Sequence, residues 1–173
     1  PLVFAGFGLS APAAGYDDYA GVDVSGKAVL IFSHEPQETD PDSPLNGRRP
    51  MPETTLYRKA ETARAHGARL LLVVSDPSHQ RDAGLYEQFQ IVPEVEAAPL
   101  AVLRVRREQL QPLIDEWALD AVAALIGRDL RPRSQPLAGA TVDYDEALVV
   151  ERRQVRNVVG ILRGADAGLA SEA

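Results

Sequence analysis

Two short runs of apolar residues constrain the fold of this chain more than any other feature of its sequence. Residues 27–33 read KAVLIFS and residues 68–75 read ARLLLVVS, and neither run alternates with polar residues. A strand that is apolar on both sides is typical of the centre of a sheet whose two faces are both covered. We therefore predict two buried strands, the second of which ends at Asp76-Pro77.

A helix is predicted between these two strands, over Thr55–His66. Thr54 or Thr55 is placed to cap its first turn, because a threonine hydroxyl can accept a hydrogen bond from a free backbone amide there. The helix should end at a glycine, which adopts the left-handed conformation of a C-terminal cap at little cost. Small and apolar residues recur at helical spacing and predict close packing on a sheet: Leu56, Ala60, Ala63 and Gly67.

The remaining elements follow from the same patterns. Two helices are expected after residue 105, one with Pro112 in its first turn and one capped by Asp120. The polar, proline-containing segments 34–52 and 78–96 are expected to be long surface loops. Further strands are predicted over 2–9, 99–105, 139–144 and 148–162. This order lacks the strict alternation of a doubly wound sheet and favours a mixed sheet or open barrel with a few helices.

Composition excludes several classes of function. The 173 residues include 18 basic and 25 acidic side chains, a formal net charge of −7, so the chain lacks the basic footprint that nucleic acid requires. With no cysteine it has no disulfide, thiol nucleophile or cysteine-based zinc site. No apolar run approaches the roughly 20 residues that span a bilayer. None of this decides the cellular compartment.

Candidate metal ligands are few. The acidic segment around residues 34–42 could offer oxygen ligands to Ca²⁺, but it lacks the EF-hand pattern, and a solvated acidic loop is the favoured interpretation. His66 precedes Gly67 and is placed to interact with the C-terminus of the helix. His79 lies in a loop without a metal-like neighbour. We therefore predict no metal site in this chain. The residues of the acidic segment are His34, Glu35, Glu38, Asp40 and Asp42.

The motifs of catalysis are also missing. There is no G-x-S-x-G nucleophile elbow and no phosphate-binding loop, and Gly6-Phe7-Gly8 lacks the third glycine of a dinucleotide fingerprint. The serines are typical of turns and strand ends. We therefore predict no catalytic residue and no cofactor; the chain is expected to bind, cover or position something. Candidate contacts to a peptide or protein partner are Arg48, Arg49, Tyr57 and Tyr86.

Five segments, taken in order, resemble one family. FAGFGLSAPAAGYDDYAGVDVSGKAVLIF resembles the opening of a protease-associated (PA) domain as inserted in secreted zinc exopeptidases. TLYRKAETARAHGARLLLVVSDP is similar to its central unit of helix, Gly-Ala, apolar strand and Asp-Pro, and AAPLAVLRV to its next strand. RPRSQPLAGATVDY resembles the connector and strand that follow. RNVVGILRG is similar to the segment that re-enters the peptidase domain in aminopeptidase Y-like enzymes.

The resemblance implies an α+β fold, an open β-barrel or sandwich of mixed strands flanked by two to three helices. It implies a PA domain over residues 1–164, including the strands by which the chain enters and leaves, and a frayed tail over 165–173. It also implies that the chemistry belongs to a peptidase domain outside this chain. That domain would carry two zinc ions, and its first ligand motif, His-x-Asp, would follow RNVVGILRG; none of the three histidines here fits it.

On this resemblance, the chain is a non-catalytic part of an exported zinc-dependent aminopeptidase or exopeptidase. It would cover the active site, help select peptide substrates or mediate contacts, with its own peptidase domain and a peptide or protein as partners. An alternative is a free-standing interaction domain of a receptor or sorting protein. Under the first reading, the strand over 2–9 and the segment 155–162 should lie side by side, because an inserted domain leaves and re-enters its host at neighbouring points.

Overall fold

The computed structural model describes residues 1–49, 51–79 and 100–145. The chain divides into two compact units, Pro1–Asp143 and Tyr144–Ala173, and of the second only Tyr144 and Asp145 are described. Everything below concerns the first unit. The expected boundary at residue 164 and the tail after it lie outside the described residues. Within the described ranges, no helix has the length and apolar character to cross a membrane.

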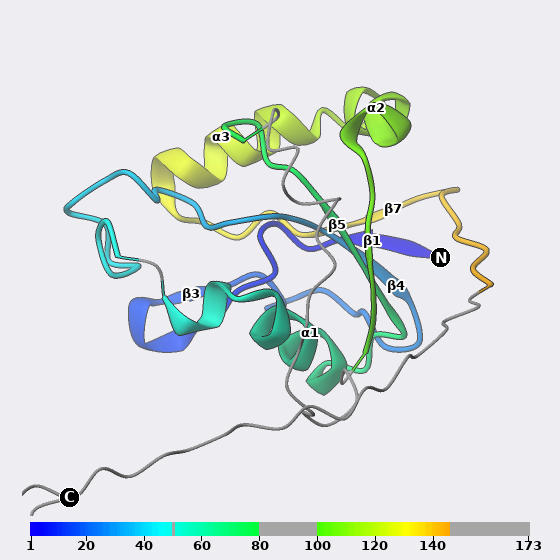
Figure 1. The fold of residues 1–173 in the computed structure, drawn as a ribbon, viewed down its shortest axis with the longest axis horizontal. Coiled ribbons are helices and arrows are strands. Elements are labelled where there is room, and N and C mark those ends of the chain that lie inside the picture. The colour runs from blue at the N-terminus through cyan, green and yellow to red at the C-terminus, as the bar shows by residue number, and fades with distance from the viewer. Residues whose placement is uncertain (50, 80–99, 146–173) are drawn as a thin grey trace, which may run out of the picture. The chain divides into compact units, whose positions relative to one another are not determined.

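One mixed sheet of five strands forms the centre of this unit (Figure 1). Its strands lie in the order β6-β5-β4-β1-β7. The first four are parallel to one another, and β7 pairs antiparallel with β1 at one edge. A separate small hairpin is formed by β2 (Ser10–Ala11) and β3 (Tyr16–Asp17). The strands of the sheet are β1 (Leu2–Phe4), β4 (Ala28–Phe32), β5 (Leu70–Val74), β6 (Ala101–Arg104) and β7 (Gln135–Leu137).

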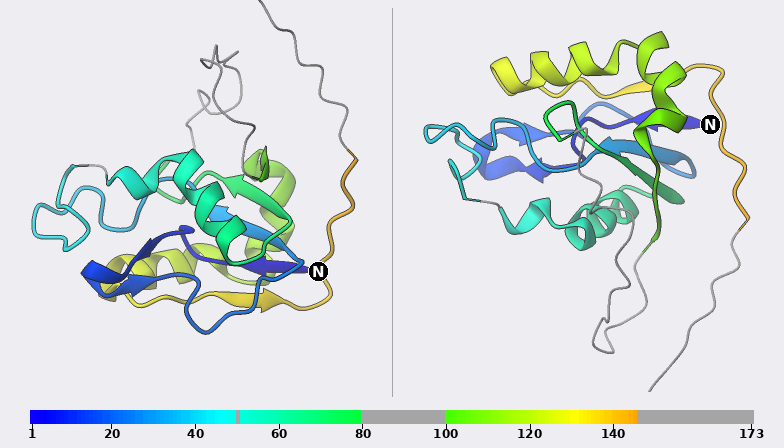
Figure 2. Two further views of the ribbon diagram at one scale, coloured as in Figure 1. Left: turned by 90° about the horizontal axis from the view of Figure 1, so that it is seen from below. Right: turned by 45° about the horizontal axis from the view of Figure 1, so that its top comes forward.

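Helices cover both faces of the sheet (Figure 2). Helix α1 (Leu56–Ala65) packs on one face, and α2 (Arg107–Glu116) and α3 (Leu119–Asp129) pack on the other. Two short 3₁₀ helices, η1 (Pro12–Ala14) and η2 (Pro52–Thr54), lie in the connections.

Successive strand residues point to opposite faces, so the two apolar runs supply two separate cores. Leu30 and Phe32 of β4 join the core beneath α2 and α3, whereas Val29 and Ile31 join the one beneath α1. The prediction of two central strands buried on both faces is confirmed. The predicted helix is also confirmed: the Thr55 hydroxyl accepts a hydrogen bond from the Arg58 amide.

The predicted α+β class, with a mixed sheet and a few helices, is confirmed. Three finer features are corrected. The strands form an open sheet and not a barrel, because β6 and β7 are the two ends of the strand order. The closing strand is β7 rather than 139–144, which contains no strand. The first strand ends at Phe4, since the chain turns at Gly6 and Gly8, both at positive φ.

Helix ends were also predicted imperfectly. Pro112 lies inside α2 instead of in its first turn. Asp120 lies in the first turn of α3, whose N-cap is Ala118. The place beside β1 that we expected for 155–162 is taken by β7, with Leu2 opposite Leu137. Residues 155–162 themselves lie outside the described part of the chain.

Candidate functional site

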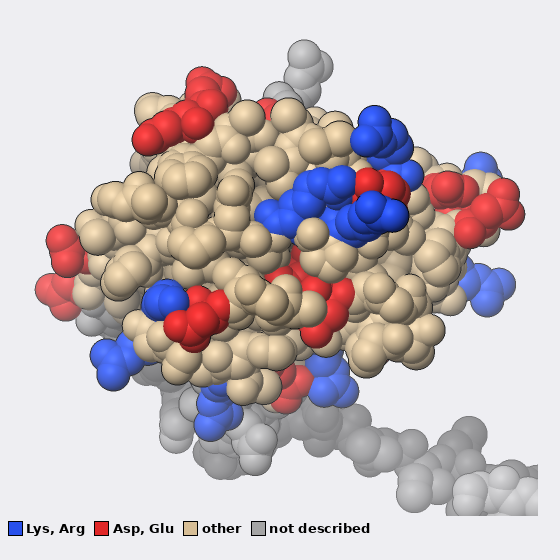
Figure 3. Space-filling view, turned by 180° about the vertical axis from the view of Figure 1, so that it is seen from behind, with Lys and Arg blue, Asp and Glu red and all other residues tan. Residues whose placement is uncertain are grey.

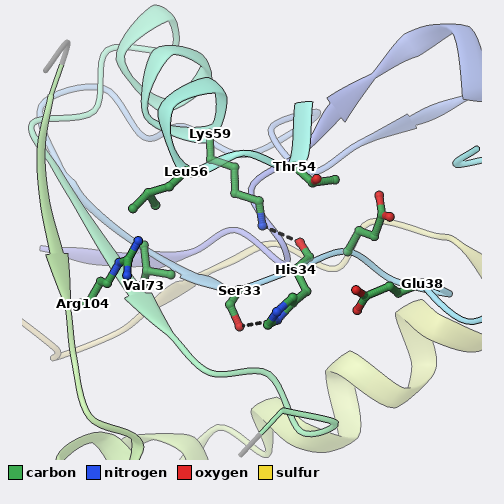
Figure 4. Close-up of a pocket in the computed structure, with 9 residues that line it drawn as sticks. Ser33, His34, Glu38, Thr54, Leu56, Lys59, Val73 and Arg104 are labelled. Atoms are coloured by element: carbon green, nitrogen blue, oxygen red, sulfur yellow. Dashed lines mark hydrogen bonds between the residues drawn. The ribbon is translucent and has the colours of Figure 1, made fainter. Parts of the chain in front are cut away.

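Polar side chains gather where β4 and β5 end. The two strands are parallel neighbours, so the segments that follow them emerge at the same edge of the sheet. Ser33 and His34 follow β4, and Ser75 and Asp76 follow β5. In open sheets of parallel strands this carboxyl edge is the usual place for ligand sites. Figure 4 shows Ser33 and His34 there, with Lys59 of α1 directed toward the backbone of His34.

The Asp76 carboxylate is the centre of this cluster. Its Oδ2 atom lies 2.8 Å from Nδ1 of His34 and 2.9 Å from Nδ1 of His79. The Ser33 hydroxyl lies 3.1 Å from the same oxygen, and the Ser78 amide donates to Oδ1 at 2.9 Å. Asp76 is only 4% exposed, so these donors replace the water that it loses on folding.

The two imidazoles stack on each other and face a glutamate. Their ring centroids are 3.8 Å apart at an interplanar angle of 26°. Nε2 of His79 lies 3.6 Å from Oε2 of Glu38. One ligand atom from each of His34, Glu38 and His79 lies within 4.8 Å of the other two. Two imidazole nitrogens and a carboxylate oxygen are a donor set that can hold a transition-metal ion.

Lys59 fixes the backbone on the other side of His34. Its ammonium group donates to the carbonyl oxygen of His34 at 2.5 Å and to that of Phe32 at 3.3 Å. The side chain is 2% exposed. His34 has a φ of 55°, in the left-handed region that residues other than glycine rarely adopt. The buried lysine therefore holds an unfavourable backbone conformation in place, as is common at functional sites.

A cavity of about 260 Å³ opens beside this cluster. It brings together acidic, basic and apolar groups from the segment after β4, from η2 and α1, and from β5 and β6. Glu35 is 6% exposed, and its Oε2 atom is buried without a hydrogen-bond partner. The lining residues are Ser33, His34, Glu35, Glu38, Thr54, Leu56, Lys59, Val73 and Arg104.

Burial and charge shift the titration of these groups. Burial and the charge of Glu38 raise the pKa of Glu35 to about 7. Burial lowers the pKa of Lys59 to about 8, although the surrounding carboxylates oppose this. The hydrogen bond with Asp76 raises the pKa of His34. For Asp76, burial raises the pKa, but the hydrogen bonds from His34, Ser78 and His79 outweigh it and bring the pKa down to about 2.

The described residues among those predicted to contact a partner lie outside the cavity lining. Arg48 and Arg49 are exposed, and Arg48 donates to the Thr39 carbonyl at 3.2 Å. Tyr57 is 44% exposed on α1, and Tyr86 lies outside the described residues. None of the three described residues lines the cavity. Acidic and basic side chains are interspersed on the face of the molecule in Figure 3.

The prediction that His79 has no metal-like neighbour is wrong, because folding brings it beside His34 and Glu38. Sequence reasoning also missed Asp76 and Lys59. It treated Asp76 only as the end of a strand and Lys59 only as part of a helix. One signal could have found the cluster: Ser-His directly follows one buried strand and Asp-Pro-Ser-His the next. Consecutive parallel strands would bring those two endings together.

Comparisons of the chain with protein-family models, with curated proteins and with solved structures find no match.

Proposed function

We propose that this chain is a non-catalytic, PA-type domain of a zinc-dependent exopeptidase, in which it covers the active site, helps select peptide substrates or mediates protein contacts. The sequence segments that resemble this family, in family order over nearly all of the chain, support the proposal. The α+β architecture with a mixed sheet and helices is compatible with it.

The pairing of the first and last described strands is the observation that carries this proposal. Leu2 at the start of β1 lies opposite Leu137 at the end of β7, and the Leu2 amide donates to the Ala140 carbonyl at 3.1 Å. The chain therefore enters and leaves this unit at one place. An inserted domain requires this geometry, because its two connections must reach neighbouring points of the host.

The position of the cavity fits a contact role. The chain enters and leaves at the amino edge of the parallel strands, whereas the cavity lies at their carboxyl edge. A host domain joined at the amino edge need not cover the cavity. Peptide or protein contacts at the cavity are therefore compatible with insertion.

The reading frame on either side of this segment tests the proposal most directly. Spaced His, Asp and Glu zinc ligands downstream, beginning with a His-x-Asp segment, are the expected result. A membrane span there, without such ligands, would instead support a free-standing interaction domain of a receptor or sorting protein.

An activity assay of the 173-residue chain is the second test. We expect no hydrolysis of aminoacyl or dipeptide substrates, with or without added zinc. Hydrolysis that is abolished by a chelator would refute the proposal, because the chain would then be an enzyme in its own right.

A further inference from the structure

The cluster at the ends of β4 and β5 has the features of a built metal site. We propose that His34, His79 and Glu38 bind one Zn²⁺ ion, with Asp76 as the positioning residue for both histidines. This site is separate from the two zinc ions expected in a peptidase domain, and the inference does not depend on the proposed function.

The donor atoms are already close to the spacing that zinc requires. Bond lengths of 2.0–2.2 Å in a tetrahedral site place ligand atoms roughly 3.3 Å apart. Nε2 of His79 and Oε2 of Glu38 are 3.6 Å apart, and all three donors lie within 4.8 Å of one another. The donor atoms must approach by up to about 1.5 Å to reach those bond lengths. One imidazole must also rotate, because the two stacked ring planes lie 26° apart and both nitrogens have to point at one ion.

Asp76 engages the Nδ1 atom of both imidazoles and so leaves both Nε2 atoms for a metal. Each presents Nδ1 to its carboxylate, at 2.8 Å from His34 and 2.9 Å from His79. With the Nδ1 proton directed at Asp76, Nε2 is the nitrogen that coordinates. Metal-binding histidines usually place their second nitrogen against such an acceptor, which fixes the tautomer and raises the basicity of the ligand.

The backbone of His34 is held in place before any ion binds. Lys59 donates to its carbonyl oxygen at 2.5 Å, and the residue has a φ of 55°. Strain of this kind costs about 1–3 kcal/mol and persists only where the surroundings impose it. The held backbone fixes the point from which the His34 ring reaches Asp76.

A buried carboxylate oxygen without a partner gives further support. Oε2 of Glu35 is inaccessible and accepts no hydrogen bond, in the cavity that His34 and Glu38 also line. An unsatisfied buried oxygen is costly, and native structures usually explain one by a water or an ion. Glu35 lies outside the group of three ligand atoms, so it would meet the ion only through a bridging water.

Donor chemistry selects the ion. The charges around the cluster nearly balance, because Glu38 and Asp76 face Lys59 and Arg104, and Glu35 is only partly ionised near neutral pH. Imidazole nitrogens favour Zn²⁺ and its neighbours in the first transition row, whereas Ca²⁺ and Mg²⁺ prefer oxygen alone. Bound zinc would crosslink the segment after β4 and the segment after β5.

Titration of the tag-free, 173-residue chain with Zn²⁺, followed by calorimetry and by competition with a chromophoric chelator, tests the site. We expect one ion per chain, weak or no response to Mg²⁺ and Ca²⁺, and visible bands of tetrahedral Co²⁺ when cobalt replaces zinc. Zinc at 100 times its dissociation constant should raise the melting temperature by roughly 5–10 °C.

Variants distinguish this site from adventitious surface binding. His79→Gln and Glu38→Gln should each weaken zinc binding, and Asp76→Asn should weaken it by about 10- to 100-fold without removing a ligand. His66→Gln is the matched control, because His66 lies away from the cluster and stacks on Tyr19 with ring centroids 4.6 Å apart. The zinc affinity of this variant should equal that of the unaltered chain.

Circular dichroism and thermal unfolding without metal establish that each variant is folded. The Glu38 side chain is 33% exposed in a surface loop, so Glu38→Gln should leave the chain folded. This variant therefore tests the site even if a histidine variant unfolds. The proposal is overturned if the folded chain binds no zinc. It is equally overturned if Glu38→Gln and His79→Gln bind zinc as tightly as the unaltered chain.

Discussion

Two aspartates are buried in this unit, and their surroundings differ in one decisive respect. Asp18, which is 0% exposed, accepts from the amides of Phe7 and Leu9 at 3.0 and 3.1 Å and from the Tyr16 hydroxyl at 2.7 Å. Two of these three donors are backbone groups, and all three are buried. Asp76 instead accepts from two imidazoles that are about one-third exposed. Asp18 therefore serves the fold, whereas Asp76 presents its partners to a ligand.

The two carboxylates also differ in titration. Burial raises the pKa of Asp18 to about 6, although its hydrogen bonds from Tyr16, Leu9 and Phe7 oppose that shift. At Asp76 the hydrogen bonds prevail over burial, and the pKa falls to about 2. The comparison teaches that a buried carboxylate is not in itself a functional signal. Its role depends on whether the groups that donate hydrogen bonds to it remain exposed and able to bind a ligand.

The largest effect is expected where the chain turns against Asp18. A Cβ on Gly6 would lie 2.2 Å from Oδ1 of Asp18, and φ is +50°. Gly6→Ala should therefore lower the free energy of unfolding by about 3 kcal/mol or more, measured by urea denaturation. Gly15→Ala is the control, since φ is +70° there but no atom lies within 4 Å, and it should cost about 1 kcal/mol. Equal losses would show that Asp18 does not hold this turn rigidly.

The second prediction uses the opposite titrations of the two aspartates. Between pH 4 and 6 the folded chain binds more protons at Asp18 than the unfolded chain, so the free energy of unfolding should fall as pH rises. Between pH 2 and 4 the unfolded chain binds more protons at Asp76, so stability should rise with pH. Each contribution is on the order of 2 kcal/mol. Urea denaturation of metal-free protein at a series of pH values measures both slopes.

Substitutions separate these two contributions. Asp18→Asn should flatten the slope above pH 4, and Asp76→Asn the slope below it. Glu35 titrates in the same direction as Asp18, because burial raises its pKa to about 7, so Glu35→Gln removes its share of the decrease. His34, whose pKa is also raised, contributes a further decrease near and above pH 6.5. A slope between pH 4 and 6 that survives both Asp18→Asn and Glu35→Gln would contradict the assignment.

The smallest effect on stability is expected for substitutions in the loop that contains Arg48 and Arg49. Arg48 and Arg49 are exposed, and the one side-chain hydrogen bond described for the pair joins Arg48 to a backbone carbonyl. Replacing both by alanine should change the free energy of unfolding by less than about 0.5 kcal/mol and leave zinc affinity unaltered. In the exopeptidase that we propose as the parent protein, weaker binding of peptide with unchanged stability would identify the pair as contacts. Unchanged binding would remove them as candidates.

Most of the fold could be predicted because its signals are local. Continuous apolar runs predict buried strands, and the spacing of Ala60 and Ala63 predicts the helix that packs on them. The errors lie where tertiary contacts prevail over local preference. Pro112 is tolerated inside α2, and Gln135–Leu137 forms a strand despite its proline, because β7 is an edge strand.

The cluster could not be predicted residue by residue. His34, Glu38, Asp76 and His79 are separated by up to 45 positions, and each is unremarkable among its sequence neighbours. Their meeting depends on β4 and β5 being adjacent and parallel in register, with Phe32 opposite Val74. The burial of Glu35 and Lys59 could not be predicted either. Each is buried only because α1 and the loop after β4 pack together in the folded chain.

The sequence by itself determined which segments are apolar on both sides, where helix α1 begins and ends, and the absence of cysteine and of the common catalytic motifs. These depend on short-range periodicity and on residue type alone. Only the tertiary structure decided that the sheet remains open, that β7 pairs beside β1, and that two histidines share one buried carboxylate. Those features depend on which strands pair, and pairing is fixed by burial of both sheet faces at once.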